Sequence, residues 1–364
     1  MYIPIAQPSI SGNEKKYILS CLKSTWISSA GEFIDRFENS FAQFIDTKYA
    51  ITTSNGTTAL HLALLALGIG PGDEVIVPAL TFVTTANVVT YTGAKPVFVD
   101  IDKHSWNMDP TKIENSITKK TRAIIPVHLY GYPADMNKIM RIARMHKLFV
   151  IEDAAEAHGA LIQRKKVGAI GDIGCFSFFG NKIMTTGEGG MITTNSKKLS
   201  EKIRLLKNHG MDKKRPYYHP IIGYNYRLTN LQAALGLAQL EQIKKLLAKR
   251  TQIAKIYENL LSQIPGIVLQ PKEEEVSPVC WLFSLRITQS FGTSSKKVIT
   301  HLKKHGIDAR PFFITLPKLP MYQTKKQFPI ADQVSQEGIN LPTFVGLTKK
   351  QQQLIVRVLQ NTPR

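Results

Sequence analysis

The chain has 364 residues, 43% hydrophobic and 20% charged, which is the composition of a globular protein rather than a disordered one. No apolar run approaches the ~20 residues that a transmembrane helix needs, and the amino terminus lacks the basic and then apolar pattern of a signal peptide. The formal net charge is +20, but the lysines are scattered in pairs without a helix-turn-helix or RNA-binding motif. We therefore do not expect nucleic acid as the partner. A basic surface suits an anionic small substrate equally well, or reflects only the composition of the host.

The three cysteines, Cys21, Cys175 and Cys280, are far apart in the sequence. No CxxC pair and no histidine cluster accompanies them, which argues against a disulfide framework and against a zinc site. We expect no metal and a reducing, cytoplasmic environment.

The first 50 residues are predicted to form an amino-terminal arm and two helices, at 12–22 and 32–44. The second helix places phenylalanines on one face. From residue 50 onward, short β-branched segments alternate with helical ones. Strands are predicted at 50–53, 74–78, 96–100, 123–127, 148–152, 174–179 and 191–194. Helices are predicted at 57–67, 84–92 and 136–145. This alternation predicts an α/β fold with a mostly parallel sheet and helices on both faces.

The pattern changes after about residue 197 to long amphipathic helices, at 199–207 and 230–258, the second of which is expected to cross between domains. The remainder predicts a strand at 280–287, helices at 294–305 and 349–359, and a proline-rich segment at 310–321. We therefore expect two domains. The arm and a large α/β domain occupy 1–240, and a small α+β domain occupies 241–364.

Ligands of an open parallel sheet bind at the carboxyl ends of its strands. Gly56 and Thr57 lie between a predicted strand and a helix, where free N–H groups and the helix dipole favour a phosphate. The alternative is an ordinary helix cap by Thr57 or Thr58. The glycines at 168, 171 and 174 are not a dinucleotide fingerprint, because no strand–turn–helix unit frames them.

Lys182 follows an aromatic strand that ends at Gly180. Removal from water lowers the pKa of a lysine, and the neutral amine attacks carbonyl groups to form Schiff bases. A surface lysine in a glycine-rich loop is the alternative.

Two further side chains lie at predicted strand ends. Asp153 ends a buried strand, so its carboxylate needs a cationic partner such as a protonated pyridine nitrogen. Phe82 could stack on a flat ring. Each has a structural explanation when taken alone. Together with the phosphate loop and Lys182, they meet the requirements of pyridoxal phosphate.

With these residues in place, the chain resembles the sugar-nucleotide aminotransferases of the DegT/DnrJ/StrS family, which are fold-type I (aspartate aminotransferase-like) pyridoxal-phosphate enzymes. The resemblance runs nearly end to end and rests on the segments 25–29, 54–57, 77–82, 152–157, 176–182, 186–190 and 223–227. Within the family, these segments are most similar to the GDP-perosamine synthases.

The resemblance implies roles around the cofactor ring. Lys182 carries the cofactor as a Schiff base and moves protons, and Asp153 pairs with the pyridine nitrogen. Phe82 stacks on the ring, and Glu156 lies beside the ring hydroxyl.

The resemblance also implies how the phosphate is held. Gly56, Thr57 and Ser177 bind it, and Asn225 reaches it from a second subunit. A homodimer would then be the smallest active unit.

For the substrate, the resemblance implies contacts from Trp26, Arg227 and Arg310. The proline-rich segment departs from the family pattern, because Pro317 replaces an expected histidine. Sugar recognition by this loop is therefore open.

The implied activity is transfer of an amino group from glutamate to C4 of a GDP-linked 4-keto-6-deoxyhexose, in ping-pong order through pyridoxamine phosphate, for surface polysaccharide such as O-antigen. Alternatives are a UDP- or dTDP-linked substrate, amination at C3, a pyridoxamine-dependent sugar dehydratase, and a nucleic-acid-binding regulator. The dehydratases carry histidine in place of the lysine, so Lys182 argues against that reading.

Overall fold

The fold is described from a computed structural model, which covers residues 2–363. Its central feature is a seven-stranded sheet in the order β1-β9-β8-β5-β4-β2-β3. The strands are β1 (Tyr49–Thr53), β2 (Glu74–Pro78), β3 (Lys95–Val99), β4 (Thr121–Ile124), β5 (Phe149–Asp153), β8 (Ile173–Ser177) and β9 (Gly190–Thr194). The pairs from β3 to β8 are parallel, whereas β9 is antiparallel to both β8 and β1. The predicted α/β class and mostly parallel sheet are confirmed.

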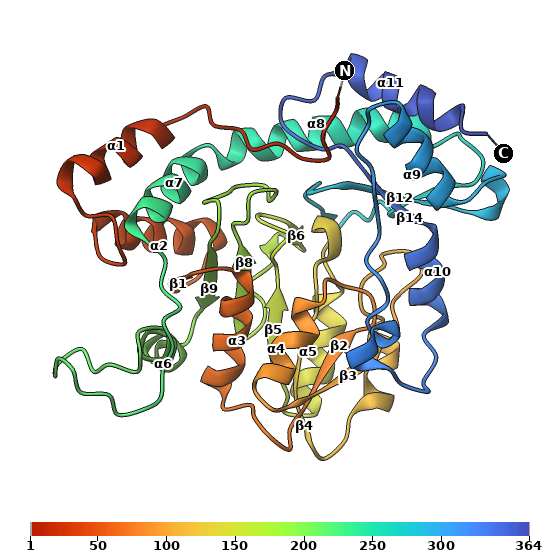
Figure 1. The fold of residues 1–364 in the computed structure, drawn as a ribbon. Coiled ribbons are helices and arrows are strands. Elements are labelled where there is room, and N and C mark those ends of the chain that lie inside the picture. The colour runs from red at the N-terminus through yellow and green to blue at the C-terminus, as the bar shows by residue number, and fades with distance from the viewer. Residues whose placement is uncertain (1, 364) are drawn as a thin grey trace.

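Within residues 2–207, six α-helices pack around this sheet (Figure 1). They are α1 (Glu14–Ser24), α2 (Glu32–Ile45), α3 (Gly56–Leu67), α4 (Thr84–Tyr91), α5 (Met136–Met145) and α6 (Lys197–Lys207). In α2 the predicted phenylalanine face is confirmed. Phe37 and Phe41 are buried and lie 5.2 and 5.4 Å, between ring centroids, from Phe178 of the segment after β8. This aromatic cluster fixes the end of β8 that leads to Lys182.

The prediction of one continuous helix at 230–258 is wrong. Two helices, α7 (Asn230–Glu241) and α8 (Ile243–Leu261), meet at Gln242, whose backbone leaves the helical region. The side chain of Gln242 donates to Glu14 at 3.0 Å and accepts from Ser11 at 3.0 Å. The break lets α7 pack against α1 and α2 while α8 continues toward the carboxyl-terminal sheet (Figure 1). The hydrophobic pattern gives no sign of it, because apolar residues continue on both sides of Gln242, at Leu240, Ile243 and Leu246.

The carboxyl-terminal part is a four-stranded antiparallel sheet in the order β10-β12-β14-β13. Its strands are β10 (Ile267–Leu269), β12 (Phe283–Ile287), β13 (Arg310–Pro311) and β14 (Gly338–Leu341), and its helices are α9 (Ser295–Lys304), α10 (Pro329–Glu337) and α11 (Lys349–Gln360). The sequence did not predict α10. This sheet has a hydrophobic core of its own, which Ile253 and Tyr257 of α8 join. The boundary after residue 240 stays a prediction.

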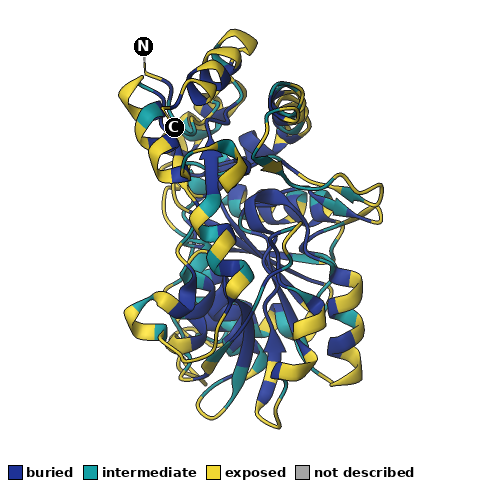
Figure 2. Cartoon of the chain, turned by 90° about the vertical axis from the view of Figure 1, so that its right-hand side faces the viewer, coloured by how far each residue is buried: buried dark blue, intermediate teal, exposed yellow. Residues whose placement is uncertain are grey.

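A small third sheet links the two parts of the chain. It pairs β11 (Val276–Ser277) with β6 (Leu161–Ile162), and β6 with β7 (Lys165–Lys166). Buried residues gather along the central strands, and exposed ones lie on the outer helix faces (Figure 2). Within residues 2–363, no helix combines the length and apolar character required to cross a bilayer.

Candidate active site

A pocket of about 450 Å³ opens at the carboxyl ends of β2, β5 and β8, next to the amino terminus of α3. This volume lies within the range usual for small-molecule sites. Its lining includes the predicted residues Gly56, Thr57, Phe82, Asp153, Glu156, Ser177 and Lys182. Residues separated by more than 120 positions in the sequence therefore meet in one cavity.

Lys182 points into this pocket, and its side chain is only 11% exposed. A tight turn brings it there, since its N–H donates to the carbonyl of Phe179 at 2.9 Å. The amine Nζ lies 3.6 Å from Oε1 of Glu156 and 3.9 Å from the centroid of the Trp281 ring. Burial lowers the pKa of Lys182, and the nearby carboxylates oppose this only in part. A surface role for this lysine is excluded.

Glu156 is buried next to the amine. Its Oε2 accepts a 2.8 Å hydrogen bond from the backbone N–H of Tyr130. Burial raises the pKa of Glu156 to about 7, and Lys182 lowers it only partly. Glu156 can therefore take up or give a proton close to neutral pH.

Asp153 is buried at the end of β5. Its Oδ2 accepts a hydrogen bond from Oγ1 of Thr85 at 2.8 Å, and its Oδ1 accepts from the N–H of Ala155 at 3.3 Å. Burial raises the pKa of Asp153, because removal from water disfavours the charge. A protonated ring nitrogen in the pocket would supply the opposite charge that this carboxylate lacks.

The amino terminus of α3 forms a small cradle that suits a phosphate. Asn55, rather than Thr57 or Thr58, caps the helix: its side chain accepts from the N–H of Thr58 at 2.9 Å. The N–H groups of Gly56 and Thr57 find no acceptor within residues 2–363. A Cβ at Gly56 would lie 2.9 Å from Cβ of Ser177, so only glycine leaves room beside the serine. Free N–H groups at a helix amino terminus bind anions.

Phe82 forms part of the pocket wall and is 54% exposed. Its ring lies 5.6 Å from that of Phe313, which lies 5.5 Å from Tyr130. The exposed face of Phe82 is available to a flat ring in the pocket.

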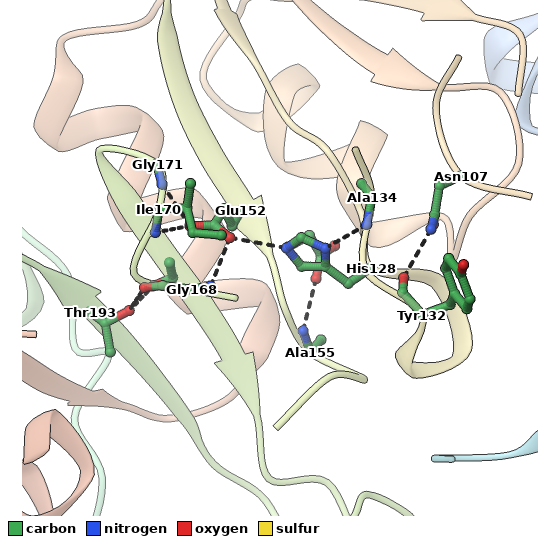
Figure 3. Close-up of polar contacts among 12 residues, drawn as sticks. Asn107, His128, Tyr132, Ala134, Glu152, Ala155, Gly168, Ile170, Gly171 and Thr193 are labelled. Carbon is green, nitrogen blue, oxygen red and sulfur yellow. Dashed lines mark hydrogen bonds and ion pairs between the residues drawn. The ribbon is translucent and has the colours of Figure 1, made fainter. Parts of the chain in front are cut away.

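On β5, the buried carboxylate of Glu152 anchors the strand (Figure 3). It accepts three backbone hydrogen bonds of 2.7 Å, from the N–H groups of Gly168, Ile170 and Gly171. His128 adds a fourth contact. Its Nδ1 accepts a hydrogen bond from the N–H of Ala134 at 3.0 Å, so the ring proton is on Nε2. Nε2 then donates a hydrogen bond to Oε2 of Glu152 at 3.1 Å. The glycine-rich loop thus binds an internal carboxylate rather than a dinucleotide, and the network fixes the strand that carries Asp153.

The predicted residues Trp26, Asn225, Arg227 and Arg310 do not join the lining of this pocket in the described part of the chain. Trp26 is 58% exposed. Asn225 accepts a 2.9 Å hydrogen bond from Arg227, on the exposed connection between α6 and α7. Arg310 is held by Asp308 through contacts of 3.0 and 2.9 Å, which raise its pKa. The roles expected for these four residues stay predictions.

Sequence reasoning missed four residues at or next to the pocket. Trp281 and Phe313 line it, Thr85 holds Asp153, and Tyr130 holds Glu156. Phe313 lies in the proline-rich segment 310–321, whereas Thr85, Tyr130 and Trp281 belong to none of the motifs in the sequence. Pro317 is buried in a short 3-10 helix and lies outside the pocket lining.

This fold, with a buried lysine near the carboxylates of Glu156 and Asp153, defines the class of fold-type I pyridoxal-phosphate transferases. The chain belongs to the DegT/DnrJ/EryC1/StrS aminotransferase family, whose profile matches residues 8–360. The chain is therefore an aminotransferase of a pyridoxal-phosphate-dependent family.

Similar proteins fall in the same group. GDP-perosamine synthase of Caulobacter vibrioides is 50% identical over 350 residues, which is 95% of this chain and 94% of the relative. GDP-perosamine synthase of Escherichia coli O157:H7 is 48% identical over 96% of this chain and 95% of the relative. Among solved structures, Helicobacter pylori PseC, an aminotransferase involved in the biosynthesis of pseudoaminic acid, superimposes with a TM-score of 0.94. It is 29% identical over 100% of this chain and 99% of that one.

Proposed function

We propose that this enzyme transfers the amino group of glutamate to C4 of a GDP-linked 4-keto-6-deoxyhexose, yielding 2-oxoglutarate and the 4-amino sugar. The observation that carries this proposal is the position of Lys182 between Glu156 and Trp281 in a buried pocket with a phosphate cradle. The GDP-linked substrate is supported by the names of the two relatives with 50% and 48% identity.

The residues present fit pyridoxal phosphate. Gly56, Thr57 and Ser177 would hold its phosphate, Asp153 its protonated ring nitrogen, and Lys182 its aldehyde carbon. When bound, the cofactor supplies an electron sink for the carbon from which a proton is removed. The amino group would be retained in the pocket between the two half-reactions, which corresponds to ping-pong order.

Lys182 moves the proton between carbon atoms. Burial keeps the pKa of its amine below the ordinary value, so a larger fraction of the amine is neutral and able to accept a proton. Asp153 keeps the ring nitrogen charged, because a buried carboxylate favours a cation at hydrogen-bond distance. Phe82 covers one face of the ring space.

We further propose a homodimer in which Asn225 and Arg227 complete the site of the partner subunit. Both lie on an exposed connection, outside the pocket of their own chain. Large apolar side chains that a second copy could cover are exposed on that connection and at the amino-terminal loop: Tyr217 is 89% exposed, Ile222 88% and Trp26 58%. The three unpaired cysteines of the described chain support a cytoplasmic location.

The test combines one variant with a substrate panel. Purified protein should show the visible absorbance of a lysine–cofactor bond, and Lys182→Ala should lose both the absorbance and turnover. The exposed Lys198→Ala is the matched control. GDP-, UDP- and dTDP-linked 4-keto sugars with glutamate, followed by mass spectrometry, identify the substrate. Retained turnover in Lys182→Ala, or amination of a UDP- or dTDP-linked sugar alone, would refute the corresponding part of the proposal.

A further inference from the structure

We propose that Trp281 is a positioning residue for Lys182: the face of its indole ring holds the lysine ammonium group beside Glu156 while the lysine is not bonded to the cofactor. This inference rests on the proposed role of Lys182 in the function above.

The geometry at the amine carries the proposal. Nζ of Lys182 lies 3.9 Å from the centroid of the Trp281 ring and 3.6 Å from Oε1 of Glu156. A cation within ~6 Å of an indole face is attracted by the ring, and the attraction strengthens when water is excluded. Water is largely excluded here, because Trp281 is 4% exposed and the lysine side chain 11%. The ammonium group therefore has an attractive partner on each of two sides.

The indole is fixed to the chain segment that carries the lysine. Its Nε1 donates a 2.8 Å hydrogen bond to the carbonyl of Asn181, the residue before Lys182. The carbonyl of Trp281 accepts a 2.8 Å hydrogen bond from the buried Arg250. Ring and backbone are therefore both held, and the ring face cannot turn away from the amine without breaking the hydrogen bond to Asn181.

Tyr130 connects the two partners of the amine. Its ring stacks on Trp281, with centroids 6.2 Å apart and planes 21° from parallel, while its N–H donates to Glu156 at 2.8 Å. Tyr130 adopts φ 56°, a left-handed conformation that is rare for a bulky residue. Strain of this kind persists only where the surroundings enforce it, often at functional sites. Gly131 follows at φ 94°, and a Cβ there would lie 1.8 Å from the carbonyl of Val279. The strained segment thus fits closely against the chain that leads to Trp281.

The chemical consequence has a defined sign. The indole face stabilises the charged amine, whereas burial favours the neutral one, and burial prevails in lowering the pKa of Lys182. Removing the indole face while keeping the site apolar removes one of the stabilising partners. Loss of a desolvated cation–π contact of the usual strength should move the protonation midpoint of the Lys182 amine down by about one pH unit.

The experiment uses cofactor-free protein and pyridoxal phosphate as the probe. The rate of formation of the lysine–cofactor absorbance is measured against pH, and the adduct is then reduced with borohydride and located by peptide mass. In Trp281→Leu, the pH midpoint of the rate should fall by about one unit relative to the wild type. Trp281→Met, which fills the space with a flexible apolar chain, should shift it in the same direction. Trp281→Phe keeps an aromatic face and should stay close to the wild type. The pH dependence of the probe itself is common to all four proteins.

The outcomes separate the two claims. If the wild-type adduct is not on Lys182, the proposed function fails. If the adduct is on Lys182 but the midpoint in folded Trp281→Leu or Trp281→Met is unchanged or higher, only the inference about Trp281 is overturned. Circular dichroism of each variant identifies those that fold, and the aliphatic variant that folds decides the question. If neither aliphatic variant folds, Trp281 is required for folding, and a role confined to positioning the amine is overturned.

Discussion

Oγ1 of Thr85 donates a 2.8 Å hydrogen bond to Oδ2 of Asp153, and both side chains are buried. The Thr85 hydroxyl donates to one carboxylate oxygen and so stabilises the negative charge of Asp153, which burial disfavours. Thr85 lies on α4, which follows β2, whereas Asp153 ends β5. The bond therefore ties together two strand ends that border the pocket.

The first prediction concerns this bond. Thr85→Val keeps the shape but leaves a buried oxygen without its donor, which costs about 1–3 kcal/mol. Because loss of the donor raises the pKa of Asp153 further, the carboxyl should pair less well with a protonated ring. We expect about a tenfold loss of pyridoxal phosphate affinity for 1.4 kcal/mol, measured by absorbance titration. Thr85→Ser keeps the hydroxyl and should bind nearly as well as the wild type. Equal affinity in the valine variant would contradict the proposed role of the bond.

The second prediction concerns the phosphate cradle. Gly56→Ala places a Cβ 2.9 Å from Cβ of Ser177, which closes the space that the phosphate needs. We expect pyridoxal phosphate affinity to fall by about tenfold or more, since a contact of this length forces the neighbours apart. Pyridoxal, which lacks the phosphate, should bind Gly56→Ala and the wild type alike. Gly180→Ala is the matched control, because a Cβ there meets nothing within 4 Å. An equal loss for both ligands would argue against a phosphate site at Gly56.

The third prediction tests the shared site. Lys182→Ala and Asn225→Ala should each be inactive or nearly so as homodimers. If Asn225 serves the partner's pocket, a hybrid dimer contains one site with both residues intact and one with neither. Refolding an equimolar mixture should then restore activity toward about a quarter of the wild-type value, as random pairing in a two-fold dimer requires. No recovery would mean that each site takes both residues from a single subunit, and sedimentation would show whether a dimer forms at all.

The fourth prediction concerns pH and stability. His158 is fully buried against Phe176 and Phe178, and neither ring nitrogen has a hydrogen-bond partner within the described chain. Burial, with a contribution from Lys182, lowers its pKa to about 3. Between pH 6.5 and 3, the unfolded chain therefore binds a proton at this site that the folded chain does not, so stability falls as the pH falls.

Between pH 6.5 and 3, His158 is expected to lower the free energy of unfolding by about 1.4 kcal/mol for each unit by which the pH falls. His158→Leu removes this contribution. Its free energy of unfolding should therefore fall less steeply than that of the wild type as the pH decreases from 6.5 to 4.5, a range that lies between the unfolded and folded pKa values of His158. Urea titrations at several pH values measure it, with the exposed His104→Leu as control. Parallel pH profiles of wild type and His158→Leu would show that His158 does not take part in acid unfolding.

Local pattern was sufficient for much of the fold. The strand Glu74–Pro78 and the helix Met136–Met145 were predicted at their observed bounds, because β-branched residues and helical spacing mark them without help from distant residues. The single-residue break at Gln242 and the helix Pro329–Glu337 were not predicted. The first depends on contacts with the amino-terminal arm. The second begins at a proline, and its apolar stripe is short.

The active site also contains features that the sequence predicts and features that it does not. The sequence alone determined that Gly56, Asp153 and Lys182 follow strands, and a parallel sheet brings the carboxyl ends of its strands to one edge, so their meeting could be predicted. Only the tertiary structure decided that Trp281, about 100 residues away, lies over the amine of Lys182, and that Tyr130 holds Glu156. The first contact comes from packing of the carboxyl-terminal part against the large sheet, and the second joins the segment after β4 to the segment after β5. Packing depends on the three-dimensional fit of surfaces, and no short sequence pattern encodes it.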